Sequence, residues 1–248
     1  YNFPFCSSQT KESFFSDYIN SDLVIFPFHS SAFLQFVDNL TRQEYKKFFK
    51  LNIKKVLWTL DNHLFFKEDA LVQKMVDMLY VAHINYTSHL EQSKFRYLPS
   101  AYYLTGIDEY IKDLSLEIPQ RYDMFINFRY FKHHLHSNQR VKVMFDIAKL
   151  IKKYFSNLKI LFASIPNGKD YIHAIKSSNV IVNVSMLDDF NIRNFEAIAF
   201  NKPLLASYTS AHYFTQKTYG LDFSNTFLFK RDCTNFYDKL KIALHSEP

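Results

Sequence analysis

The stretch NVIVNVSMLDDFNIRNFEAIAFNKPLLASY, residues 179–208, decides the predicted fold. Residues 179–185 form a short apolar run typical of a buried strand, and residues 191–200 have the apolar spacing of a helix. A second apolar run, 203–208, follows after a short turn. Strand, helix and strand in this order predict a βαβ unit with two parallel strands.

The same alternation extends on both sides of this stretch. We expect further strands at 123–128, 159–165 and 226–230, and helices at 140–155, 169–177 and 234–245. Strands that alternate with helices indicate a parallel sheet that is covered by helices on both faces.

The amino-terminal half repeats the pattern, with strands predicted at 22–28, 54–60 and 81–87 and helical spacing at 31–50 and 68–80. Residues 112–121, KDLSLEIPQR, are polar and contain Pro119, so they make the best linker. We therefore predict an α/β protein of two Rossmann-like domains, 1–115 and 116–248, that face a cleft. Open α/β sheets bind ligands at the carboxyl ends of their strands.

Composition narrows the class of protein. The chain of 248 residues is 48% hydrophobic and 18% aromatic, which excludes a largely disordered protein. No run approaches the roughly 18 to 20 consecutive apolar residues of a membrane helix, and the first residues lack the order of a signal peptide. Cys6 and Cys233 make neither a disulfide framework nor a metal-ligand spacing. We expect a cytoplasmic protein.

Glycine occurs only three times, at Gly106, Gly168 and Gly220. Neither a G-x-G-x-x-G fingerprint nor a Walker loop can be built from them, which argues against an ordinary NAD-binding Rossmann enzyme or P-loop NTPase. The net charge of +6 suits an anionic partner such as a nucleotide, a phospholipid surface or nucleic acid. Drift in an A+T-rich genome accounts for both the scarce glycine and some of the lysines, so charge alone selects no partner.

Two acids, Asp188 and Glu196, lie eight positions apart around the predicted end of the strand at 179–185. Asp188 is expected in the loop after the strand and Glu196 in the second turn of the next helix, both facing the ligand. A carboxylate can accept both hydroxyls of a ribose, and a helix start favours a diphosphate. The alternative is that Glu196 caps its own helix or pairs locally with Arg193.

The segment VNVSMLDDFNIRNFEAIAFNKPLLAS, 182–207, resembles the carboxyl-terminal nucleotide-binding signature of GT-B glycosyltransferases. It is most similar to the group related to spore maturation glycosyltransferases, in which an apolar strand and N-x-S precede R-x-F-E-A-x-A. VLWTLDNHLFF (56–66) and YLPSAYY (97–103) resemble the W-x-x-D and L-P-x-A segments of that group. Five residues match the signature helix: Arg193, Phe195, Glu196, Ala197 and Ala199.

The resemblance implies a GT-B fold and transfer of a sugar from a nucleotide-sugar donor. By this resemblance Glu196 binds the ribose, and Asp188 stands near the donor sugar. Arg193 holds the loop at the helix start or the phosphates. Asn194, in the same segment, is assigned with them to the donor nucleotide site.

The sequence departs from the family in the loop that is expected to contact the diphosphate. GT-B enzymes usually have a glycine-containing loop there, whereas residues 129–140 read RYFKHHLHSNQR. Arg129, Lys132 and Arg140 are the candidates to neutralise the phosphates, and Arg140 is selected with Arg193. The turn FNKP at 200–203 replaces a C-G-x-P-like turn, and the amino-terminal domain is short, so loss of activity is an alternative.

Three further features have competing explanations. His133, His134 and His136 lack acidic or cysteine partners at a metal-ligand spacing, so we expect a basic loop and no metal. Asp61 follows a buried strand and is a candidate for acceptor activation, or it ends the strand as an Asx turn. Residues 41–55 mix lysines with aromatics. This pattern is typical of a helix that lies on a membrane surface, and it also fits an ordinary helix with one solvated face.

These observations predict a metal-independent glycosyltransferase of the EC 2.4 class that uses no cofactor. Its donor would be a UDP- or GDP-linked sugar, and its acceptor a glycan, a lipid-linked molecule or a protein in surface-glycan or glycoconjugate synthesis. Peripheral contact with the inner membrane surface is compatible with this role, and nucleic acid is not expected as a partner. The alternatives are a catalytically degenerate GT-B-like nucleotide-binding or interaction module and a phage-type DNA-modifying glycosyltransferase.

Overall fold

The computed structural model describes residues 11–27, 29–60, 62, 64–99, 117–128, 135–166, 168–185 and 187–246. Contacts within the chain separate two compact units, residues 1–100 and 101–248. The domain boundary predicted between residues 115 and 116 lies outside the described residues and stays a prediction. Among the helices of the described ranges, none combines the length and apolar character that crossing a bilayer requires.

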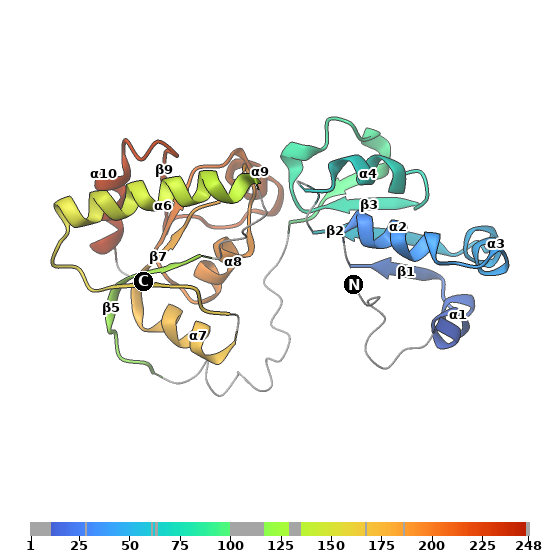
Figure 1. Cartoon of the computed structure of the whole chain (residues 1–248), viewed down its shortest axis with the longest axis horizontal. Coiled ribbons are helices and arrows are strands. Elements are labelled where there is room, and N and C mark those ends of the chain that lie inside the picture. Colours follow the sequence, from blue (N-terminus) through green and yellow to red (C-terminus); the bar gives the residue numbers. More distant parts are fainter. Residues whose placement is uncertain are drawn as a thin grey trace. The chain divides into compact units, whose positions relative to one another are not determined.

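The first unit contains a parallel sheet in the order β1-β2-β3-β4 (Figure 1). Its strands are β1 (Leu23–Phe26), β2 (Lys54–Thr59), β3 (Met78–Val81) and β4 (Phe95–Tyr97). Its helices are α1 (Lys11–Ile19), α2 (Ser30–Asp38), α3 (Arg42–Lys50) and α4 (Phe66–Val72), with 3-10 turns at Ile84–Tyr86 and Gln92–Lys94.

Aromatic side chains dominate the core of this unit. Phe33 of α2 and Phe48 of α3 are both 0% exposed, and Phe26 of β1 packs between them with ring centroids 5.1 and 5.9 Å away. The Tyr18 hydroxyl of α1 donates to the Phe48 carbonyl at 2.6 Å, which satisfies a hydroxyl that this packing buries. The core therefore joins three helices to the edge strand β1.

Two expectations for this unit were wrong in detail. The predicted helix 68–80 ends at Val72, and β3 begins at Met78, three residues before the predicted strand 81–87. The reason is strand pairing, because Met78 and Leu79 lie opposite Val56 and Leu57 of β2, and Leu79 is 0% exposed. This tertiary pairing overrides the helical spacing in the sequence.

The second unit contains a parallel sheet in the order β6-β5-β7-β8-β9. Its strands are β5 (Tyr122–Asn127), β6 (Ile160–Ala163), β7 (Ser178–Asn183), β8 (Leu204–Ser207) and β9 (Thr226–Phe229). Its helices are α6 (Leu135–Tyr154), α7 (Lys169–Lys176), α8 (Ile192–Ala199), α9 (Ser210–Tyr219) and α10 (Phe236–Leu244). All the strands and helices predicted for this half are present, and α9 is an addition.

Helices cover both faces of the second sheet. Side chains of α6 and α10, such as Ile147 and Leu240, pack on one face, and side chains of α7 and α8, such as Ile175 and Ala197, pack on the other (Figure 1). The chain runs from β5 to β6 on one side and then returns to β7 on the opposite side of β5. The carboxyl ends of β5 and β7 therefore form the topological switch point, where doubly wound sheets bind ligands.

Candidate functional site

Asn127, the last residue of β5, organises one side of the switch point. Its side-chain amide donates to the Ile165 carbonyl at 3.1 Å and accepts from the Ile165 N–H at 2.9 Å. The side chain is buried, so both bonds replace hydration that the amide loses. The pair fixes the loop after β6 to the end of β5 and leaves the Asn127 carbonyl available to another partner.

Arg193 supplies that partner from the first turn of α8. Its Nη1 donates to the Asn127 carbonyl at 2.8 Å, and its Nε donates to the Tyr171 hydroxyl at 3.1 Å. The side chain is 14% exposed. Because β5 and α8 flank the switch point, Arg193 joins the two strand ends between which a ligand is expected.

The start of α8 is itself held by an asparagine pair. Asn191 is the N-cap residue and accepts from the Arg193 N–H at 3.1 Å. Asn183, at the end of β7, exchanges side-chain hydrogen bonds with Asn191, both at 3.0 Å. This pair fixes the path of the loop that carries Asp188.

Glu196 lies inside the unit, contrary to the expectation that it faces the ligand. Its side chain is 1% exposed, it accepts a hydrogen bond from the Tyr171 hydroxyl, and Arg193 Nε lies 3.8 Å away. Burial raises the pKa of the Glu196 carboxyl and also raises the pKa of Tyr171. The contact with Arg193 is the local pairing predicted from the sequence as an alternative to ribose binding. The ribose role of Glu196 stays a prediction.

Asp188 and Asn194 also have partners within the protein. The Asp188 carboxylate accepts from the N–H and the hydroxyl of Ser210, at 3.2 and 2.9 Å, at the start of α9. Asn194 is 0% exposed and its amide oxygen lies 3.0 Å from Nε2 of His212, whose pKa burial lowers to about 4. Both contacts depend on α9, and their predicted roles at the donor stay predictions.

Arg140, on α6, is the predicted residue that lines a pocket. Its Nε is buried and has no hydrogen-bond partner among the described residues. Burial and, to a smaller extent, the charge of Arg193 lower the pKa of Arg140 to about 10, although the charge of Asp189 acts in the opposite direction. The charges of Arg140 and Arg193 therefore act on each other, and an anion bound near both would offset this repulsion.

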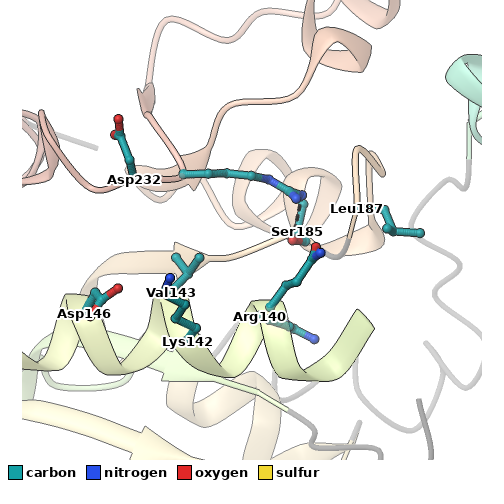
Figure 2. Close-up of a pocket in the computed structure, with 9 residues that line it drawn as sticks. Arg140, Lys142, Val143, Asp146, Ser185, Leu187 and Asp232 are labelled. Atoms are coloured by element: carbon teal, nitrogen blue, oxygen red, sulfur yellow. Dashed lines mark hydrogen bonds between the residues drawn. The ribbon is translucent and has the colours of Figure 1, made fainter. Parts of the chain in front are cut away.

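The pocket has a volume of about 420 Å³ and is formed by three segments (Figure 2). These are α6, the loop after β7 and the loop after β9, so two of them are carboxyl ends of strands. The lining residues are Gln139, Arg140, Lys142, Val143, Asp146, Ser185, Leu187, Arg231 and Asp232. Glu196, Arg193, Asn194 and Asp188 are not among them.

Several sequence-based candidates lie outside the described residues, namely Asp61, Arg129, Lys132, His133 and His134. Their predicted roles are therefore untested. Within the described ranges, no three histidine, cysteine, aspartate or glutamate side chains gather into a cluster that could hold a metal ion.

Four residues of the site escaped the sequence-based search. Ser185 is in the N-x-S of the signature, and Arg231 directly follows the strand predicted at 226–230, so their positions at strand ends were an available signal. Asn127 lies one residue before the end of the strand predicted at 123–128, so the same signal was available for it. No local sequence pattern indicated that Tyr171 belongs to the site, because its contact with Glu196 joins residues 25 positions apart.

No family model matches the chain, and no curated protein does either. Three similar solved structures are 10–13% identical to it. A sucrose-phosphate synthase from Thermosynechococcus elongatus has 13% identity and a TM-score of 0.52, with 94% of this chain and 69% of that one covered. The apo structure of OtsA has 11% identity and a TM-score of 0.56, with 96% and 72% covered.

The third structure is described as trehalose-6-phosphate from E. coli bound with UDP-2-fluoro glucose. It has 10% identity and a TM-score of 0.54, and the match covers 95% of this chain and 68% of that one. At such identities the likeness concerns the fold, and the relation to the spore maturation group stays a prediction. The chain has the predicted α/β fold of the GT-B type, with two Rossmann-like domains.

Proposed function

We propose that this protein is a glycosyltransferase that moves a sugar from a nucleotide-sugar donor to an acceptor hydroxyl. The observation that carries the proposal is the placement of Arg140 and Arg193, from two different helices, beside the switch point of the second sheet. Guanidinium groups whose charges act on each other are stabilised by an anion bound near both, and a diphosphate is such an anion.

The proposed chemistry needs charge stabilisation at the leaving group. The bond between the anomeric carbon and the phosphate oxygen breaks, a bond to the acceptor oxygen forms, and the acceptor proton passes to a base. Arg140 and Arg193 stabilise the negative charge that develops on the departing diphosphate, a role that a metal ion has in other transferases. Asp188 is assigned to the donor sugar, Glu196 and Asn194 to the nucleoside, and Asp61 to acceptor activation.

The proposal includes a UDP- or GDP-linked donor and a glycan, lipid-linked or protein acceptor. A thermal-shift panel of UDP, GDP, CMP and ADP sugars identifies the base, because a ligand that binds only the folded state raises the melting temperature. With the right donor, purified protein should release nucleoside diphosphate in the presence of EDTA. Strict dependence of that release on a divalent metal would contradict the proposal.

Arg140→Gln tests the carrying observation. Loss of a charge-assisted hydrogen bond to the diphosphate should weaken donor binding by about 10-fold or more. Lys152→Gln is the matched control, since Lys152 is an exposed cation on the same helix. Equal affinities in the two variants would exclude a direct role for Arg140.

A catalytically degenerate nucleotide-binding module is the second candidate. It is favoured by the engagement of Asp188 and Glu196 with protein groups, because neither carboxylate is held open for a ligand. Nucleotide binding without turnover across a broad acceptor panel would favour this candidate over the transferase.

A further inference from the structure

The basic and the acidic side chains that line the 420 Å³ pocket differ in whether they have partners within the protein. Arg140, Lys142 and Arg231 form no ion pair with an acid among the residues that the structure describes, although Asp189 acts on Arg140 from a distance. The pocket therefore contains basic groups whose charge is incompletely balanced by their surroundings.

The two acids of the pocket, in contrast, already have donors. Asp232 accepts from the N–H of Thr234 at 3.0 Å and from its hydroxyl at 2.8 Å, and these bonds lower the pKa of Asp232. Asp146 pairs with Lys149 at 3.4 Å. In Figure 2 both acids lie toward the left of the view, and Arg140 and Ser185 lie toward the right. Arg140 and Ser185, each with a buried polar atom that has no hydrogen-bond partner among the described residues, thus lie away from the two acids in this view.

Ser185 gives independent evidence for a ligand at that end. It is 2% exposed, and its hydroxyl has no hydrogen-bond partner among the described residues. Its backbone is fully used, because the N–H donates to the Ser207 hydroxyl at 2.9 Å and the carbonyl accepts from Arg231 Nη2 at 2.9 Å. Buried polar groups are nearly always hydrogen-bonded, so an unused Ser185 hydroxyl and an unused Arg140 Nε on two residues that line the same pocket indicate a place for an acceptor.

We infer that this pocket is a binding site for a phosphoryl group. The Ser185 hydroxyl and the Arg140 guanidinium donate to its oxygens, Arg231 reaches it from the loop after β9, and Lys142 adds charge at the side. The volume is in the range of small-molecule sites and exceeds the space that one phosphate needs. The site takes a pyrophosphate or a phosphorylated small molecule, and it does not require that the chain transfers a sugar.

Two sources of the phosphoryl group are distinguished by calorimetric titration of the full chain. Pyrophosphate alone tests the pocket, and uridine, which lacks phosphate, should not bind there. If pyrophosphate displaces UDP, the phosphoryl group belongs to a nucleotide. If both bind together, it belongs to a separate phosphorylated ligand. Either result supports the site, whereas failure of folded protein to bind pyrophosphate at millimolar concentration overturns it.

Ser185→Ala and Arg231→Gln locate the site. Each removes one donor and should weaken pyrophosphate binding by about 10-fold, since hydrogen bonds to a charged ligand are stronger than neutral ones. Arg231→Lys keeps the charge and should restore part of the affinity. Lys152→Gln, on the exposed face of α6, should leave it unchanged. A lower melting temperature with unchanged pyrophosphate affinity in Ser185→Ala and Arg231→Gln would show a structural role only and overturn the inference.

The two proposals fail separately. Release of nucleoside diphosphate from a donor by wild type, together with a pyrophosphate affinity that is unchanged in Ser185→Ala and Arg231→Gln, would support the transferase and overturn the phosphoryl pocket. Pyrophosphate binding that depends on Ser185 and Arg231, without turnover of any donor, would support the pocket and exclude the transferase.

Discussion

At the scale of single residues, the contact between Tyr171 and Glu196 changes what a mutation should do. A carboxylate that binds ribose loses its charge-assisted bonds in Glu196→Gln, so nucleotide affinity should fall about 10- to 150-fold. Because Glu196 is 1% exposed and bonded to Tyr171, the melting temperature should change too, unlike at an open cleft. Calorimetry and thermal denaturation measure both.

Tyr171→Phe separates the two readings of Glu196. The change removes the hydroxyl that donates to Glu196 and accepts from Arg193, so the melting temperature should fall by a few degrees. Without the Tyr171 hydroxyl, the Glu196 carboxylate has one hydrogen-bond donor fewer within the protein. If it binds a ribose, nucleotide affinity should therefore stay the same or rise. Lower melting temperatures in both variants, with nucleotide affinity unchanged, would assign Glu196 to the fold alone.

Asp69 predicts a pH dependence of the first unit. It is 0% exposed on α4, and burial raises its pKa to about 7, partly offset by a hydrogen bond from Ser30. The pKa of Asp69 in the folded state exceeds its unfolded value near 4, so the folded state holds this proton more tightly. The free energy of unfolding should therefore fall as the pH rises from about 4 to about 7, by up to about 1.4 kcal/mol per pH unit.

Asp69→Asn tests this dependence. The amide cannot ionise, and the buried hydroxyl of Thr59 on β2, which acts on the Asp69 carboxyl, is a nearby partner for it. Urea denaturation from pH 4 to 8 should show a slope in wild type that is absent in the variant. An identical slope in both proteins would mean that another group titrates.

At the scale of elements, Asp188 stabilises the start of α9. Asp188→Asn removes a negative charge from a helix amino terminus, which should cost about 0.3 to 1 kcal/mol of unfolding free energy. If Asp188 also lies beside the donor sugar, affinity for free nucleoside diphosphate should stay within about threefold while turnover falls far more.

Asp238→Asn is the matched control, because Asp238 is an exposed acid in the first turn of α10. It should lower stability by a similar amount without any effect on turnover. Equal turnover in the two variants would leave Asp188 with only its helix-start role.

The elements that were predictable are those with a strong apolar pattern. β7 and β8 are almost wholly buried, and their continuous apolar runs predicted their ends within two residues. α9 was missed because only three of its ten residues, Ala211, His212 and Thr215, are buried, so it has no apolar stripe. β3 was misplaced because its strand pairing is a tertiary effect.

The candidate site was predictable only in part, for a related reason. Arg140 was selected for its charge and does line the pocket. Ser185 and Arg231 come together from loops 46 residues apart, which no local pattern records. The position of the switch point depends on the order of the strands in the sheet, and this order cannot be predicted from the spacing of residues along the chain.

At the scale of the whole molecule, the net charge of +6 is the only feature that favours a nucleic-acid partner. DNA binding through many phosphate contacts weakens steeply with salt, whereas one diphosphate held by two arginines responds mildly. We expect no tight binding of double-stranded DNA near physiological salt, measured by fluorescence anisotropy. Submicromolar affinity with a steep salt slope would instead favour the DNA-modifying alternative.

The strand order β6-β5-β7 also has a consequence for biosynthesis. Tyr122 of β5 pairs with Ser178 of β7, so one edge of β5 stays unpaired until the ribosome has released residues as far as β7. Open strand edges pair readily with other chains, and non-local parallel pairing is slow. Nascent chains stalled near residue 170 should therefore be cleaved by added protease within β5, and chains that extend beyond β9 should be protected there. Translation speed across α7 thus sets how long the unfinished sheet is exposed to aggregation.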